Sequence, residues 1–229
     1  MDSAKHCKKL HKILERCKTF KHPIDWKNLP NNGVYFFYEK GETWGHGGGK
    51  SRIVRVGTHR EGNFISRMKS HYIDDKIIER IHRNSACPKD RSIFRKNIGR
   101  AILAKTKSDY LPVWEVDFQT PKNRLRYGDK RNIELEKNLE HRINQMLKEK
   151  FNFKVVPTGM HEAIIGGKGL EARLIGTLSH CKSCRPSNKW LGRYSPKEKI
   201  RSSGLWLEQH LDNDTLINND WKSVKNCIK

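Results

Sequence analysis

The chain has 229 residues, of which 47 are Lys or Arg and 25 are Asp or Glu, so its formal net charge is +22. This length suits one large domain, or a core with added segments. So large an excess of positive charge favours nucleic acid as the partner, because each phosphate that a cation neutralises releases condensed counterions. No apolar stretch approaches the roughly 20 residues of a membrane-spanning helix, so we expect no membrane partner.

The first 20 residues, MDSAKHCKKLHKILERCKTF, predict a basic amphipathic helix with Leu10, Ile13 and Leu14 on its apolar face. They lack the apolar core of a signal peptide, so we expect a helix that packs on the domain, and a cytoplasmic location. Without a secretion signal, the six cysteines at positions 7, 17, 87, 181, 184 and 227 are expected to be free thiols.

The segment HCKSC at 180–184 has the spacing of half a zinc site. The sequence holds no second Cys-x-x-Cys pair, so a complete site would need His180, Cys7 or Cys87 to fold back onto this segment. We therefore expect a solvated loop at this position and favour it over structural zinc.

Two short apolar stretches, at 34–39 and 52–56, predict a pair of β-strands joined by the glycine-rich segment KGETWGHGGGKS. The periodicity of the remaining chain predicts further helices and strands. The helices are expected over 63–73, 91–105, 132–150 and 170–180, and the strands over 112–118 and 151–158. The order β-β-α, helical insertion, β, α predicts an α/β fold of the α+β kind.

Four motifs follow one another along the chain: Gly-Val-Tyr at 33–35, Arg-Val-Gly at 55–57, Arg67, and Leu-Glu-Ala-Arg-Leu-Ile at 170–175. In this order they resemble the GIY-YIG nuclease superfamily, whose members cut DNA with one divalent metal. The resemblance implies a small three-stranded sheet flanked by helices.

The resemblance also implies a division of the chain into segments. Residues 1–29 would form a basic helix and linker, and residues 196–229 a C-terminal extension packed on the core. Residues 30–195 would form the nuclease core, with a large helical insertion at about 76–150.

The resemblance assigns catalytic roles to three residues of the first half. Tyr35 would activate or orient the attacking water. Arg67 and His71 lie one helical turn apart, so they share a helix face. They would stabilise charge on the phosphoryl group and assist the leaving group, since an arginine fork binds phosphate oxygens and stays charged.

Glu171 is the candidate metal ligand, because it borders an apolar stripe where a carboxylate needs a compensating cation such as Mg²⁺. Glu140, in NLEHRI, is a rival in a similar stripe. We prefer Glu171, since its surroundings match the family pattern more fully. Asn188, in RPSNKWLG, resembles the asparagine that follows the glutamate helix in the family.

The second motif departs from the family, because Arg55 stands where a tyrosine is expected. An arginine cannot act as a base, though it could bind phosphate, and His59 could then position the nucleophile. This departure keeps a catalytically inactive nucleic-acid-binding relative open as an alternative. A basic protein that associates with RNA or the ribosome is a third.

Basic residues in two segments are candidates for phosphate contacts. They are Arg95, Lys96, Arg100, Lys189, Arg193, Lys197, Lys199 and Arg201. The leading hypothesis is a Mg²⁺-dependent DNA endonuclease that resembles restriction or defence nucleases. With one metal site per chain, cleavage of both DNA strands would call for a homodimer or two successive nicks.

Overall fold

The computed structural model describes residues 3–59, 62–159 and 166–225. Its sheet has four antiparallel strands in the order β1-β4-β2-β3. The strands are β1 (Thr19–Lys21), β2 (Gly33–Thr43), β3 (Ser51–Gly57) and β4 (Phe151–Pro157). The mixed α/β class is confirmed, and the three expected strands are present as β2, β3 and β4. The fourth strand, β1, was not expected, since three residues are too few to show a periodic pattern.

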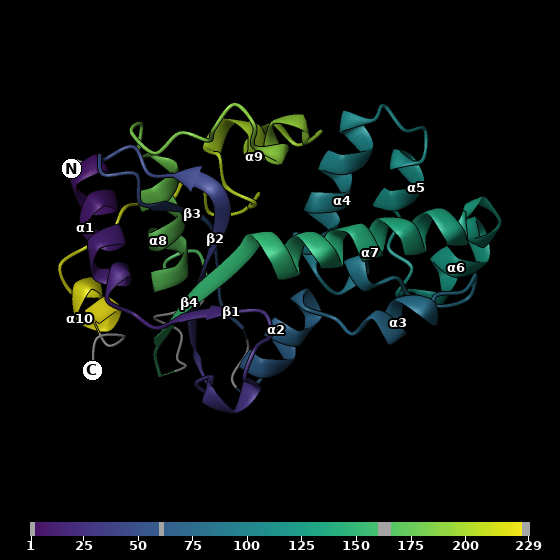
Figure 1. The fold of residues 1–229 in the computed structure, drawn as a ribbon, viewed down its shortest axis with the longest axis horizontal. Coiled ribbons are helices and arrows are strands. Elements are labelled where there is room, and N and C mark those ends of the chain that lie inside the picture. The colour runs from purple at the N-terminus through teal and green to yellow at the C-terminus, as the bar shows by residue number, and fades with distance from the viewer. Residues whose placement is uncertain (1–2, 60–61, 160–165, 226–229) are drawn as a thin grey trace.

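The two faces of the sheet are covered by different helices (Figure 1). On one side lie α1 (Ser3–Glu15), α8 (Leu170–Ser179) and α10 (Asp220–Val224); on the other lie α2 (Phe64–His71), α4 (Ile93–Lys105) and α7 (Ile133–Lys150). Alternate residues of β2 serve the two layers: Val34 and Phe36 pack toward α1 and α8, whereas Tyr35 and Phe37 pack toward α2 and α4. Because both faces are buried, the strand is continuously apolar.

The remaining helices are short. They are α3 (Asp75–Glu79), α5 (Leu111–Glu115), α6 (Pro121–Tyr127) and α9 (Glu198–Ser203). The strand expected over 112–118 is wrong, because α5 occupies its first half. Pro112 occupies the first turn of this helix, and Trp114 is fully buried with its Nε1 donating to Lys96 O at 3.0 Å. Packing of this tryptophan on α4 overrides the alternating pattern.

A buried ion pair joins α4 to α7 inside the insertion. Arg95 and Glu140 are both fully buried, with Nη2 2.6 Å and Nε 2.9 Å from the same carboxylate oxygen. Glu140 also accepts a hydrogen bond from Lys89 N at 2.7 Å. Glu140, the rival metal ligand, is therefore engaged in the core of the insertion.

The basic side chains of α4 were expected to contact phosphates, but they are engaged within the protein. Arg95 is fully buried, and Arg100 pairs with Glu115 and Glu208 at 2.6 and 2.8 Å. Lys96 donates to Glu115 O at 2.7 Å. Carboxylates that are distant in the sequence neutralise the two arginines, so neither presents a free charge to DNA.

Candidate functional site

Tyr35 lies on β2 directly opposite Gly57 of β3. Its phenol crosses the backbone of the neighbouring strand, and a Cβ at position 57 would overlap with Tyr35 Oη. The side chain is fully buried, and its Oη lies 3.3 Å from His71 Nε2. The absence of a side chain at Gly57 thus leaves the space that the Tyr35 phenol occupies.

His71 connects Tyr35 to the start of α4. Its Nδ1 lies 2.7 Å from Ser92 Oγ, and Ser92 caps α4 by accepting from Arg95 N. Complete burial lowers the pKa of His71 well below its ordinary value, and Arg67 and Arg55 lower it further. His71 is therefore a neutral imidazole beside the phenol. His71 was expected to point at a phosphate. It lies in the core instead, with no exposed surface.

Arg55 is brought beside Tyr35 by the regular pairing of β2 with β3. Phe37 pairs with Arg55, and paired residues point to the same face of the sheet, so Arg55 faces the same side as Phe37 and Tyr35. A β-bulge follows at Val54, before Ile53 pairs with Tyr38. The guanidinium interacts electrostatically with the Tyr35 phenol, donates to Trp206 O at 2.5 Å, and is only 3% exposed. Burial lowers its pKa, yet a guanidinium keeps its charge in proteins. Arg55 is thus an internal cation and not a surface contact.

Glu171 occupies the first turn of α8, where the helix dipole favours an anion. Its Oε1 accepts a hydrogen bond from Thr58 N at 3.1 Å, and among the described residues no hydrogen bond uses Oε2. Burial raises the pKa of this carboxyl, and the charge of Arg55 opposes the rise. One carboxylate oxygen thus remains available for a ligand.

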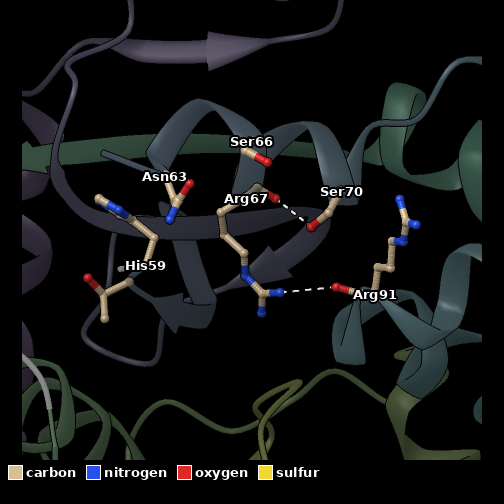
Figure 2. Close-up of a pocket in the computed structure, with 7 residues that line it drawn as sticks. His59, Asn63, Ser66, Arg67, Ser70 and Arg91 are labelled. Carbon is tan, nitrogen blue, oxygen red and sulfur yellow. Dashed lines mark hydrogen bonds between the residues drawn. The ribbon is translucent and has the colours of Figure 1, made fainter. Parts of the chain in front are cut away.

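A cleft of about 500 Å³ opens next to these residues (Figure 2). Its lining is polar or basic and consists of Thr58, His59, Asn63, Ser66, Arg67, Ser70 and Arg91. Arg67 extends across the cleft and donates from Nη1 to Arg91 O at 3.2 Å. His59 Nε2 accepts from Gly33 N at 3.2 Å, so this nitrogen already has a partner. Two guanidinium groups and several hydroxyls make the cleft suited to a phosphate.

Asn188 is exposed and lies away from this cluster. Its neighbour Ser187 donates from N and Oγ to Glu42, near the far end of β2. Glu42 and Tyr35 are seven residues apart on one strand, which corresponds to roughly 20 Å. The structure does not bring Asn188 to the other candidate residues.

Three residues of the cluster were missed from the sequence: Thr58, Ser92 and Arg91. Thr58 follows the Arg-Val-Gly motif directly, so this neighbouring position was a signal that Thr58 belongs to the site. Ser92 precedes an apolar helical stretch, which is the signature of a helix cap. No sequence signal indicates Arg91, because its place in the cleft depends on how the insertion docks on α2.

Gly57 provides a direct test of this arrangement. Gly57→Ala would place a methyl group where the Tyr35 phenol lies. We expect a loss of about 1–3 kcal/mol in the free energy of unfolding, as for other overpacked sites. Gly47→Ala is a control for added volume, since in the described part of the chain no atom lies within 4 Å of its Cβ position, although its positive φ adds some strain. Equal stability of Gly57→Ala and the natural chain in urea unfolding would contradict the close approach.

Comparison with known proteins agrees with this geometry. A family model described as the GIY-YIG domain matches residues 3–221. No curated protein and no solved structure matches the chain. No helix among the described residues is long and apolar enough to span a membrane. The match covers nearly the whole chain, insertion included, and the chain therefore belongs to the GIY-YIG domain family.

Proposed function

We propose that this protein is a Mg²⁺-dependent endonuclease that hydrolyses phosphodiester bonds in DNA. The observation that carries the proposal is the position of Tyr35 Oη, which contacts both the Arg55 guanidinium and the neutral His71 imidazole. Glu171 and Arg67 exert electrostatic effects on the same Arg55 side chain. This arrangement, beside a basic cleft, supports phosphoryl chemistry more than binding alone.

The residues present fit a single divalent cation. Glu171 offers one hard oxygen ligand that no described residue occupies, and water would complete the octahedral shell that Mg²⁺ prefers. A metal ion bound there would polarise the phosphate and stabilise the leaving oxygen. Burial makes the ionised form of Glu171 unfavourable and so raises its pKa. A bound cation would offset this cost.

The chain's own residues would handle the proton and the phosphate. Tyr35 Oη lies 3.3 Å from His71 Nε2, so the imidazole can take the phenol proton while Oη accepts one from water. Arg55, which replaces the second tyrosine of the family, would stabilise the phenolate through its positive charge. Arg67 would bind the phosphate from within the cleft.

Exposed cations after α8 would contact the DNA backbone. Lys189, Arg193, Lys199 and Arg201 are exposed and Lys197 is half-buried. Their segment packs against α4, but unlike Arg95 and Arg100 these side chains keep contact with solvent.

A second candidate function is DNA binding without cleavage. Tyr35 is 0% exposed, so in this conformation water does not reach its Oη. An inactive relative would retain the basic cleft and the charged surface, and would bind DNA with strong salt dependence.

Cleavage of supercoiled plasmid and phage DNA distinguishes the two functions. We expect nicking with Mg²⁺, none with EDTA, and a fall of at least about 10²-fold in Tyr35→Phe, comparable to loss of one catalytic proton-transfer group. Tyr72→Phe is the matched control, because the buried Tyr72 hydroxyl has no hydrogen-bond partner among the described residues.

The form of the products tests the proposed pairing of chains. Nicked circles that precede linear DNA would indicate one centre acting at a time, and linear DNA without a nicked intermediate would indicate a homodimer. DNA binding with no cleavage in any metal would contradict the nuclease proposal and support the second candidate.

A further inference from the structure

Three cysteines and a histidine from separate parts of the chain meet at the end of the sheet remote from the Tyr35 site. They are Cys7 on α1, His46 in the β2–β3 connection, and Cys181 and Cys184 just after α8. All three cysteines are free thiols and are buried. The solvated loop expected around 181–184 is therefore wrong. Elsewhere, Cys87 is also free, and Cys227 lies outside the described residues. The expectation of free thiols is wrong for Cys17, which is disulfide-bonded.

The spacing of the four ligand atoms matches a tetrahedral zinc site. The atoms all lie within 4.8 Å of one another. Bond lengths of about 2.3 Å to sulfur and about 2.05 Å to nitrogen at tetrahedral angles give edges of about 3.8 Å (S–S) and about 3.6 Å (S–N). The distance from Cys7 Sγ to Cys184 Sγ is 3.7 Å, and that from Cys181 Sγ to His46 Nε2 is 3.5 Å.

Backbone N–H groups are directed at the sulfur atoms of the cluster. Backbone N–H groups of Ser183 and Cys184 hydrogen-bond Cys181 Sγ, and that of Gly45 hydrogen-bonds Cys184 Sγ. The close approach of Gly45 to Ser183 leaves no space for a Cβ, so the β2–β3 connection lies directly on the Cys-x-x-Cys segment. Several N–H donors aimed at buried sulfurs stabilise negative charge that a metal would share.

His11 completes the shell around Cys7. Its Nε2 accepts from Ile53 N at 3.2 Å, so the proton resides on Nδ1. That nitrogen lies 2.9 Å from Cys7 O and 3.5 Å from Cys7 Sγ. With both ring nitrogens engaged, His11 supports the cluster from outside, and His46 is the histidine that remains to act as a ligand.

We infer that Cys7, His46, Cys181 and Cys184 bind one structural Zn²⁺ ion. Four protein ligands close the coordination sphere, which is the property of structural sites and leaves no position for substrate. The ion would hold together α1, the β2–β3 connection and the C-terminal end of α8. Glu171 lies at the start of α8 and Cys181 just past its end, and this ten-residue helix is about 15 Å long, so this metal is separate from the proposed catalytic one.

Metal content of the full chain, purified under reducing conditions, tests the inference without any reference to cleavage. We expect one zinc ion per chain by elemental analysis and its loss in Cys184→Ala. Cys87→Ala should keep its zinc, because this free buried thiol lies outside the cluster. Titration of the metal-free chain with Co²⁺ should give the visible bands of tetrahedral cobalt together with thiolate charge transfer.

His46→Cys keeps the test decisive even if the alanine variants fail to fold. Four thiolates can still bind zinc, so we expect this variant to retain the ion and its cobalt charge-transfer band to intensify. Three results would each overturn the inference: a reduced chain that binds neither zinc nor cobalt, zinc that persists in Cys184→Ala, or a Cys7–Cys184 disulfide in place of metal.

Discussion

Glu171→Gln is expected to abolish Mg²⁺-dependent cleavage without weakening the fold. The amide cannot supply the charged ligand, and loss of several kcal/mol of metal stabilisation corresponds to at least about 10²-fold in rate. Burial raises the pKa of Glu171, so the folded chain loses stability as pH rises through that pKa and the carboxyl ionises. The glutamine removes this cost and still accepts from Thr58 N. The melting temperature at neutral pH should therefore be unchanged or higher.

Two measurements check this expectation: the plasmid cleavage rate and the thermal midpoint, each as a function of pH. In the natural chain, activity should fall on acidification at a pH above the ordinary range of a glutamate, because the raised pKa protonates the ligand early. Glu198→Gln is the matched control, since Glu198 is also a first-turn helix glutamate but is exposed. Full activity in Glu171→Gln would refute the assignment.

Glu140→Gln is expected to have the opposite profile, with a large loss of stability and little loss of chemistry. Glu140 is fully buried against Arg95 and also accepts from Lys89 N. Removal of one charge from a buried pair costs about 3–5 kcal/mol, because the remaining charge is left uncompensated. For a chain of this size, that loss corresponds to a fall of roughly 6–20 °C in the melting temperature.

Urea unfolding and cleavage assays well below the melting temperature would separate the two effects. The folded fraction of Glu140→Gln should retain Mg²⁺-dependent activity. Arg95→Met combined with Glu140→Leu removes both charges and should be less destabilised than Glu140→Gln. A Glu140→Gln variant that is stable but inactive would show that Glu140, and not Glu171, holds the metal.

Much of the nuclease core was predictable because its signals are local. The apolar strands β2 and β3, the Arg67 helix and the Leu-Glu start of α8 follow from short-range periodicity and motif order. The place of Tyr35 beside Gly57 likewise follows from a hairpin in which the two motifs pair directly. These features depend on neighbouring residues, so the sequence alone was sufficient.

The sequence could not indicate which charged side chains would be buried and paired inside the fold. The basic pattern of α4 suggested a DNA surface, yet Glu140 lies 45 residues from Arg95 and neutralises it in the core. Arg55 looked like a lost catalytic group, and only the packed core, where Trp206 O accepts from its guanidinium, shows that this charge is buried beside Tyr35. A charge is solvated or buried according to contacts between distant segments, which the local pattern does not encode.

The sequence by itself determined the family, the α/β class and the identity of Tyr35, Arg67 and Glu171 as candidates. The tertiary structure decided the rest: the exclusion of Asn188, the burial of His71, and the meeting of Cys7 with His46 and the Cys-x-x-Cys segment. Strands and helices arise from contacts a few residues apart, whereas a metal cluster arises from segments up to 177 residues apart that only the packed core brings together.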